Sequence, residues 1–217
     1  MAADLPPVPS VPAAPTRPTQ RLGANVVRLD GTVRRPLPAN AAYVQAVLEH
    51  LGRYRWPGAP RFRGVDHLGR QVLEFLPGYV PFHAWQPPDV WSRPSLVRLA
   101  RLLRQLHDLT VGTVLAGDHD VVCHANLSPD HTVYRDEGEG LRPYALLDWD
   151  LVRPGRRVDD VAMLCWRFLE LGPARSEPTG PGRLMRLICD AYELGRRDRV
   201  ELVPTVLTWQ SRRIGEL

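Results

Sequence analysis

The sequence predicts an α+β protein of two lobes, a small N-terminal sheet lobe and a larger helical C-terminal lobe. Three observations predict this fold class: short apolar runs between turn residues over 21–76, closely spaced prolines over 77–93, and leucines at helical spacing over 96–109. A chain of 217 residues is long enough to bury a sizeable core. We expect the lobes to meet near the proline-rich stretch.

The N-terminal lobe is expected to follow a disordered arm, residues 1–20, which is rich in proline and alanine. Strands are then expected at residues 26–29, 32–35, 61–66 and 71–76. Asp30-Gly31 separates the first two strands, and Asp-Gly is a favoured hairpin turn because both positions tolerate positive φ. Asn40 is a plausible N-cap for a helix with one apolar face. Residues 21–78 therefore predict a small sheet with one helix packed on it.

The C-terminal lobe, residues 79–217, is predicted to be mainly helical, because its apolar residues recur three and four positions apart. Helices are expected from Ser92 to Asp108, from a cap at Asp159 to a stop at Gly172-Pro173, over residues 184–194, and over residues 200–214. Pro204 is tolerable only near the start of the last helix, since proline interrupts a helix interior. Prolines exclude a regular helix across most of residues 77–93.

The segment from Val121 to Asp150 is expected to form a hairpin that carries the functional site. Its polar residues are His124, Asn126, Asp130, His131, Asp148 and Asp150. They follow two short apolar runs that read as strands. Active sites are usually built from reactive groups on loops that a rigid scaffold holds. Two strands one loop apart therefore predict that these side chains share one small volume.

The composition excludes some classes of function. The net charge is only +4, and all 28 basic residues are arginines scattered along the chain, which argues against nucleic-acid binding. No apolar run is long enough to span a membrane, and no secretory signal is recognisable. Three widely spaced cysteines without a Cys-x-x-Cys pair are expected to be buried, reduced thiols. A cytoplasmic protein is the expectation.

A zinc site is an alternative for the same segment. The potential ligands are Asp118, His119, Asp120, Cys123, His124, Asp130 and His131. Zinc accepts such nitrogen, sulfur and oxygen ligands, although this spacing fits no standard zinc motif. A nucleophilic pair of Cys123 and His124 is a weaker alternative, because adjacent residues of a strand point to opposite faces.

The order of three motifs resembles the signature of the aminoglycoside phosphotransferase-like family, which shares the protein-kinase-like fold. The motifs are His124-Ala125-Asn126-Leu127-Ser128-Pro129, then Leu147-Asp148-Trp149-Asp150, then Asp160-Val161-Ala162. The segment Glu74-Phe75-Leu76-Pro77-Gly78 also resembles the hinge of this family. The resemblance covers roughly residues 21–170. It implies an O-phosphotransferase that uses ATP or another nucleoside triphosphate with Mg²⁺.

The resemblance implies where the nucleotide and metal would bind. Asp148 matches the family's Mg²⁺-binding aspartate, and Asp150 would assist it; a hard cation prefers anionic oxygen ligands. Arg34 or Arg35 falls where the family has its phosphate-binding lysine. The remaining candidates for nucleotide binding are Glu49, which could pair with that arginine, and Glu74 in the hinge segment.

The chain departs from the family pattern at the reacting positions. The catalytic aspartate aligns with Asn126, which carries no charge and cannot take a proton. The second metal ligand aligns with His131, and imidazole is a poor ligand for Mg²⁺. His124 is kept and is expected to orient the loop, while Asp160 is expected to brace it. Asp130 is a candidate to replace the missing carboxylate, as are Asp118 and Asp120 just upstream.

Three hypotheses follow. The first is an ATP-dependent phosphotransferase of small-molecule or peptide hydroxyls with an impaired or rewired catalytic loop. The second is a non-catalytic pseudokinase that binds a nucleotide or a partner protein. The third is a specialised kinase that modifies a peptide natural product. An aminoglycoside acceptor is not favoured, because the helical region shows no acidic cluster.

Overall fold

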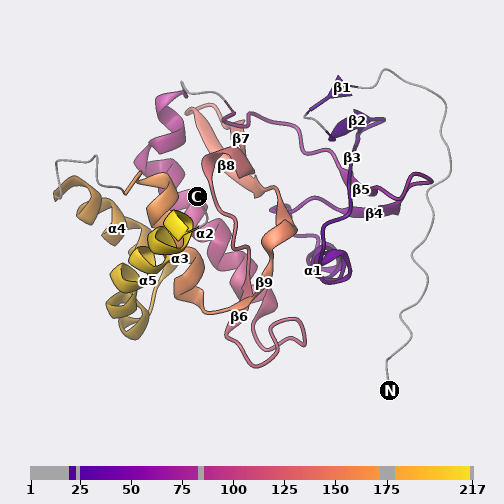
Figure 1. The fold of residues 1–217 in the computed structure, drawn as a ribbon. Coiled ribbons are helices and arrows are strands. Elements are labelled where there is room, and N and C mark those ends of the chain that lie inside the picture. Colours follow the sequence, from indigo (N-terminus) through magenta and orange to yellow (C-terminus); the bar gives the residue numbers. More distant parts are fainter. Residues whose placement is uncertain (1–19, 23–24, 83–85, 172–178, 216–217) are drawn as a thin grey trace.

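The chain forms two lobes, as the sequence predicts, with a small sheet lobe beside a larger, mainly helical lobe (Figure 1). The computed structural model describes residues 20–22, 25–82, 86–171 and 179–215. Almost all of the expected N-terminal arm lies outside these residues. Only Gln20 is described, and it belongs to the first strand.

The N-terminal lobe contains a five-stranded antiparallel sheet. Its strands are β1 (Gln20–Arg21), β2 (Val27–Leu29), β3 (Thr32–Arg35), β4 (Phe62–Val65) and β5 (Gln71–Glu74), in the spatial order β1-β2-β3-β5-β4. The predicted hairpin forms at Asp30 and Gly31, whose φ angles are 48° and 73°. The four expected strands are therefore confirmed, and β1 is an addition that the sequence pattern did not indicate.

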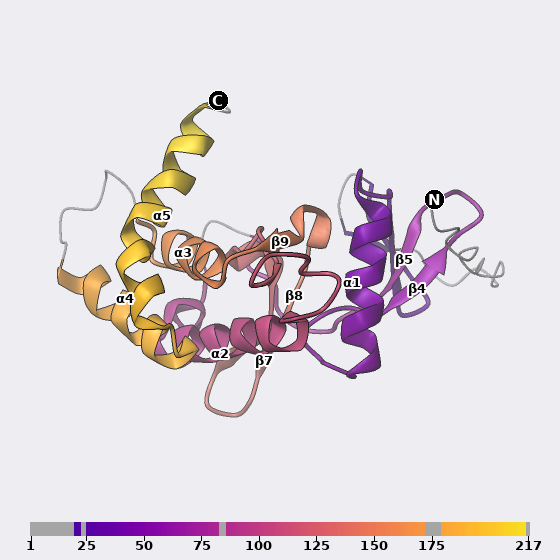
Figure 2. The same ribbon diagram turned by 90° about the horizontal axis from the view of Figure 1, so that it is seen from below.

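Helix α1 (Ala41–Arg53) lies between this sheet and the larger lobe (Figure 2). Its buried face consists of Val44, Val47, Leu48 and Leu51. Asn40 precedes the helix but its side chain makes no capping hydrogen bond, so that prediction was wrong. The Asn40 amide instead donates to the Val152 carbonyl at 3.4 Å, in the other lobe. Asn40, which was predicted to cap a helix, thus links the two lobes instead.

The described residues of the connection between the lobes, 77–82 and 86–92, contain no α-helix, as predicted. Tyr79 forms an isolated bridge with Tyr134, and each backbone N–H donates to the other's carbonyl at 2.8 Å. Gly78 has a φ of 156°, and a Cβ there would collide with the Tyr134 carbonyl. Glycine is required at this close approach. A single turn of 3₁₀ helix, η1 (Pro88–Trp91), ends the connection.

Four helices build most of the larger lobe: α2 (Arg93–Thr110), α3 (Arg157–Phe168), α4 (Thr179–Tyr192) and α5 (Arg196–Gly215). Ser92 caps α2 by accepting a hydrogen bond from the Ser95 N–H. Asp159 is not the N-cap residue of α3; its carboxylate accepts from the N–H of Arg156, three residues earlier, within a capping box. Pro204 lies inside α5, because the helix begins at Arg196, so its expected place near the helix start was wrong. The predicted stop at Gly172-Pro173 lies outside the described residues.

Two short sheets lie between these helices and the N-terminal lobe (Figure 1). They pair β6 (Val121–Cys123) with β9 (Arg153–Gly155), and β7 (Thr132–Asp136) with β8 (Leu141–Leu146). Two 3₁₀ turns, η2 (Pro129–His131) and η3 (Trp149–Leu151), lie next to the strand ends. The expected hairpin over residues 121–150 is therefore built around β7 and β8, while β6 pairs elsewhere.

The core of the larger lobe runs between α2, α3 and α4. The leucines at helical spacing in α2 are buried, namely Leu96, Leu99, Leu102, Leu103 and Leu106. All three cysteines are buried and free, as predicted. Among the described residues, no helix has the length and apolarity needed to cross a membrane.

Candidate functional site

One buried carboxylate holds the loop between β6 and η2. It lies on the side of the loop that faces α3, which we call the lower side. Asp160, in the first turn of α3, accepts hydrogen bonds from the backbone N–H of His124 at 2.7 Å and of Ala125 at 2.9 Å. His107 Nε2 lies 3.1 Å from the same carboxylate. Burial alone would raise the pKa of Asp160, but its hydrogen bond with His107 and the loop N–H groups hold that pKa below its ordinary value. A charged Asp160 thus braces the loop.

His107 extends this support to a third helix. Its Nδ1 lies 2.6 Å from the Tyr192 hydroxyl at the end of α4. Both side chains are buried. His107 and Tyr192 were not among the candidate site residues. The signal for His107 was its place in a Leu-x-x-Leu-His-Asp sequence at the end of a leucine-rich helix; nothing in the sequence indicated Tyr192.

His124 is oriented within the loop and is kept neutral. It is fully buried, its Nδ1 accepts the Asn126 N–H at 3.3 Å, and its ring meets the Trp149 ring edge-on at 4.7 Å between centroids. Burial lowers the pKa of His124 to about 4. The following residue, Ala125, has a φ of 59°, a left-handed conformation that costs an alanine about 1 kcal/mol or more. Glycine adopts this conformation without that cost, so the alanine adds backbone strain to the loop.

On the other side of the loop, which we call the upper side, four polar side chains surround Asp148 and contact it directly or through Arg35. Arg35 donates from Nη1 to Asp148 Oδ1 at 2.9 Å and from Nη2 to Asp150 Oδ2. Asn126 donates from Nδ2 to Asp148 Oδ2 at 2.9 Å, and His131 Nε2 lies 3.4 Å from that same oxygen. We call these five residues the Asp148 clasp. Its members come from β3, the loop after β6, η2, the segment that joins β8 to η3, and η3 itself.

The clasp does not fit Mg²⁺ as it stands. Asp148 and Asp150 are suitable oxygen ligands, but the guanidinium of Arg35 contacts both carboxylates. The other side chains that contact Asp148 are an amide donor and an imidazole, which Mg²⁺ does not favour. Burial raises the pKa of Asp150 above its ordinary value, and Asp148 adds to this, while Arg35 opposes it. Arg35 therefore supplies the positive charge that pairs with both carboxylates.

The other predicted site residues divide between the clasp and the rest of the chain. Arg34, the alternative to Arg35, is buried on the opposite side of β3, with Nη1 3.6 Å from Asp66. Glu49 is exposed on α1 and forms no ion pair with either arginine among the described residues. Glu74 accepts the Arg61 N–H at 3.3 Å within the N-terminal lobe. The structure therefore does not bring Arg34, Glu49 or Glu74 to the clasp.

A cavity of about 390 Å³ opens beside the clasp. Its wall consists of Ala125, Asn126, Leu127, Asp130, His131, Leu151, Arg153, Met163, Trp166, Arg167 and Trp209. Burial alone would raise the pKa of Asp130, but its hydrogen bond with Ser128 and the nearby His131 keep that pKa below its ordinary value. Asp130 is thus a carboxylate at the cavity wall, 3.8 Å from His131 Nε2.

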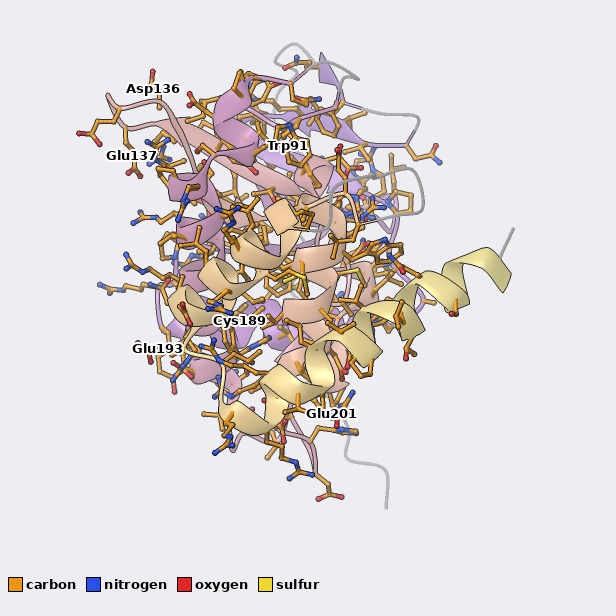
Figure 3. The ribbon with its side chains drawn as sticks, turned by 90° about the vertical axis from the view of Figure 1, so that its left-hand side faces the viewer. Trp91, Asp136, Glu137, Cys189, Glu193 and Glu201 are labelled. Atoms are coloured by element: carbon orange, nitrogen blue, oxygen red, sulfur yellow. The ribbon has the colours of Figure 1, made fainter. Side chains whose placement is uncertain are left out.

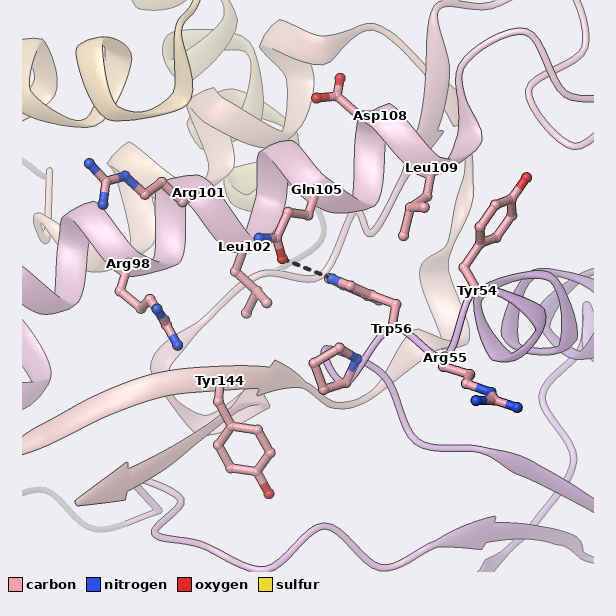
Figure 4. Close-up of a pocket in the computed structure, with 11 residues that line it drawn as sticks. Tyr54, Arg55, Trp56, Arg98, Arg101, Leu102, Gln105, Asp108, Leu109 and Tyr144 are labelled. Atoms are coloured by element: carbon pink, nitrogen blue, oxygen red, sulfur yellow. Dashed lines mark hydrogen bonds between the residues drawn. The ribbon is translucent and has the colours of Figure 1, made fainter. Parts of the chain in front are cut away.

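A larger cavity, about 590 Å³, lies where the end of α1 meets α2 and β8 (Figure 4). Trp56 lines it and donates from its indole Nε1 to Gln105 Oε1 at 3.0 Å. None of the predicted site residues lines it. The smaller cavity is the better candidate site, because it adjoins the clasp.

The zinc alternative is not supported as it was predicted. Among the described residues, the one cluster of potential metal ligands is His107, Cys123 and Asp160. It is buried, and burial with the nearby Asp160 raises the pKa of the Cys123 thiol well above its ordinary value, which disfavours a thiolate ligand. Hydrogen bonding to the loop accounts for this cluster.

A two-lobed fold with a strand–loop–strand site between the lobes defines a kinase-like phosphotransferase scaffold. The chain belongs to the phosphotransferase enzyme family, whose model matches residues 2–196. A curated relative is the trifolitoxin immunity protein of Rhizobium leguminosarum bv. trifolii, which is 28% identical over 85% of this chain and 76% of the relative.

Solved structures agree with this family. An aminoglycoside phosphotransferase of Streptomyces rimosus, solved with ADP and streptomycin, aligns with a TM-score of 0.60 at 14% identity over 87% of this chain and 92% of that chain. A macrolide 2′-phosphotransferase of Brachybacterium faecium aligns with a TM-score of 0.53 at 18% identity over 91% of this chain and 86% of that chain. At such identities the likeness shows the fold. The predicted family and kinase-like fold are confirmed.

Proposed function

We propose that this chain is a non-catalytic member of the phosphotransferase family that binds a small-molecule or peptide ligand without phosphorylating it. The observation that carries this proposal is the Asp148 clasp. Both oxygens of Asp148 contact side chains of the protein, and Arg35 also contacts Asp150. Phosphoryl transfer depends on metal ions that neutralise the triphosphate, and the clasp directs a guanidinium to those carboxylates.

The asparagine at the base position supports the same proposal. Asn126 donates its amide N–H to Asp148, so it stabilises the clasp. It carries no basic group that could take a proton from an acceptor hydroxyl. Loss of a positioned base costs about 10²–10⁴-fold in rate. The site thus departs from the family pattern at the base position, and its matching metal carboxylate, Asp148, is paired with Arg35.

The supporting structure is retained around this altered site. Asp160 and His107 still hold the loop, and the cavity of about 390 Å³ adjoins Asn126. This volume is within the range of small-molecule sites. Binding to a ligand requires this preorganised wall but not the lost groups. The name of the curated relative, an immunity protein, is compatible with protection by binding.

A phosphotransferase with a rewired loop is the second candidate. It is favoured by Asp130, which lines the same cavity as Asn126 and is held ionised near His131. In that case Asp130 would position the acceptor hydroxyl. Nucleotide binding by this chain belongs to either candidate: relatives of the fold have been solved with ADP or ATP.

The deciding experiment compares metal–nucleotide binding and ADP formation in four proteins. These are the wild type, Asp148→Ala, Asp130→Asn, and the double variant Asn126→Asp/His131→Asn. We titrate Mn²⁺ with ADP by electron paramagnetic resonance and follow ADP formation from ATP. Mn²⁺ reports on the site without a known acceptor.

For the wild type, we expect no ADP formation above that of Asp148→Ala. We expect the double variant to bind Mn²⁺ with ADP at least about tenfold more tightly than the wild type, because His131→Asn restores an oxygen ligand at the second metal position and Asn126→Asp adds a carboxylate beside Asp148. Wild-type turnover that Asp148→Ala abolishes would refute the non-catalytic proposal. If Asp130→Asn also abolished it, the second candidate would replace the first.

A further inference from the structure

The larger cavity, of about 590 Å³, has a positively charged wall. Arg55 follows the end of α1, while Arg98 and Arg101 lie on α2. Figure 4 shows Arg55 at one end of the cavity and the two arginines of α2 at the other. Three arginines and one aspartate, Asp108, give the lining residues a formal charge of +2. The volume is within the range of small-molecule sites.

Asp108 does not neutralise these arginines, because its carboxylate is already paired. It accepts from Arg104 Nε at 2.7 Å and lies 2.9 Å from Arg157 Nη1, and neither of these arginines lines the cavity. In the part of the chain that the structure describes, the guanidiniums of Arg55 and Arg101 have no hydrogen bond or ion pair. Both side chains therefore keep their donors for a ligand.

The third arginine of the wall, Arg98, is held by an exposed ion pair. Its Nη2 lies 3.4 Å from Glu137 Oε1, and the two side chains are 52% and 44% exposed. Glu137 lies at the tip of the hairpin of β7 and β8, at the outside of the molecule (Figure 3). Exposed pairs of long side chains contribute little, so an anion that enters the cavity can displace Glu137 from Arg98.

Gln105 presents hydrogen-bond donors between the two ends of the cavity. The Trp56 indole can only donate, and it gives its Nε1–H to Gln105 Oε1 at 3.0 Å. The amide nitrogen of Gln105 therefore points away from Trp56 (Figure 4), and no described residue accepts from it. The Trp56 ring is fixed in turn, because it meets the Trp149 ring edge-on at 6.5 Å and leaves no room for a Cβ at Gly58.

Arg55 occupies a position where glycine is usual. It directly follows the C-cap residue of α1 and has a φ of 53°. Its N–H donates to the Gly52 carbonyl at 3.0 Å, and the Trp56 N–H donates to the Leu51 carbonyl at 3.2 Å. This is a Schellman motif, in which a left-handed residue other than glycine strains the backbone. The chain thus carries a guanidinium at this end of the cavity although the backbone favours glycine.

We propose that this cavity binds a small molecule that carries a phosphate group at each end. One phosphate lies at Arg98 and Arg101, the other lies at Arg55, and the part between them lies against Gln105. A phosphate group offers three acceptor oxygens and a charge of about −1.5 to −2 at pH 7, and guanidinium matches it through two parallel hydrogen bonds. No lining residue belongs to the Asp148 clasp or to the smaller cavity, so this site goes beyond the proposed function.

The test uses isothermal titration calorimetry of the full chain at low salt, without metal ions. The probes are fructose 1,6-bisphosphate, fructose 6-phosphate and pyrophosphate. We expect the bisphosphate to bind at least about tenfold more tightly than either other probe, because it alone has phosphates at both ends of a sugar. Raising the ionic strength should weaken this binding, since salt screens exposed charges.

The variants Arg55→Gln and Arg101→Gln should each weaken binding of the bisphosphate at least about threefold. Gln105→Glu should weaken it at least about tenfold, because it keeps an acceptor for Trp56 but replaces the free donors with a negative charge. Arg93→Gln is the matched control and should leave binding unchanged. Arg93 is exposed, begins α2 and lines neither cavity. Circular dichroism establishes that each variant is folded.

Four results would overturn the site. They are no binding of the bisphosphate, equal binding of fructose 6-phosphate or pyrophosphate, unchanged binding in Arg55→Gln and Arg101→Gln, and binding that Arg153→Gln, in the smaller cavity, weakens instead. Each would leave the proposed function standing, since Mn²⁺ binding and ADP formation test that function. Conversely, a wild type that turns over ATP and binds the bisphosphate as expected would refute the proposed function but support this site.

Discussion

The two sides of the loop between β6 and η2 differ in how they are built. Below the loop, the buried Asp160 satisfies two backbone N–H groups and His107. Above the loop, the half-exposed Asp148 clasp joins carboxylates to a guanidinium, an amide and an imidazole. The lower side is a buried brace of the loop, while the upper side, in the function proposed above, lacks groups that phosphoryl transfer uses.

This difference follows from the cost of changing each side. A buried carboxylate that satisfies backbone donors cannot be lost without leaving those donors unpaired. A half-exposed residue in a cleft can change with little effect on folding, because water solvates its replacement. A chain can therefore keep a loop in position after its reacting groups have changed. The comparison can be tested from either side.

The largest effect should come from Asp160→Ala, on the buried side. It removes the acceptor for His124, Ala125 and His107, and should lower the free energy of unfolding by about 3–5 kcal/mol, measured by urea denaturation. Asp190→Ala is the control. Asp190 pairs with Arg199 at the surface, and its loss should cost about 0.5 kcal/mol or less. Similar losses for the two variants would contradict the bracing role.

The second effect is a pH dependence that arises from His124. Its pKa is about 4 when folded and 6.5 in the unfolded chain, so the unfolded state binds the proton more readily. The stability that His124 contributes is complete above pH 6.5 and is lost as the pH falls to about 4. The loss amounts to about 3 kcal/mol.

Urea denaturation between pH 7 and pH 4.5 measures this term. His124→Gln should flatten the dependence, whereas His67→Gln, at an exposed turn, should leave it as in the wild type. A wild-type slope that His124→Gln does not change would show that the folded chain binds this proton as readily as the unfolded chain does.

The smallest effect concerns the upper side. Arg35→Gln removes the guanidinium from Asp148 and Asp150, leaving two neighbouring carboxylates for a cation. We expect Mn²⁺ to bind at least about tenfold more tightly, as measured by electron paramagnetic resonance. Arg34→Gln is the matched control one residue earlier, because Arg34 contacts Asp66 instead. Unchanged Mn²⁺ binding in Arg35→Gln would show that Arg35 does not block a metal site.

Much of the fold could be predicted because its signals are local. The Asp30-Gly31 turn and the leucines of α2 indicate structure through spacings of a few residues. Predictions from local signals were wrong at positions where tertiary structure overrides the local preference of a residue. Asn40 suits an N-cap, yet its side chain contacts Val152 in the other lobe. Pro204 argues against a helix interior, yet α5 contains it.

The candidate site was predicted in part for the same reason. The segment from Val121 to Asp150 supplies Asn126, His131 and Asp148, which the structure brings together. The walls of the neighbouring cavity could not be anticipated. Arg153, Trp166 and Trp209 lie on three separate elements, and no short motif joins them.

The sequence by itself determined the family and the altered residues, because the order of the motifs and the identity of Asn126 and His131 can be read without coordinates. Only the tertiary structure decided what those residues contact. Arg35 reaches Asp148 and Asp150 across 113 and 115 positions of the chain, while Arg34 points away from them. The side of a strand that faces a cleft depends on how the lobes pack together, and neighbouring residues of a strand point in opposite directions.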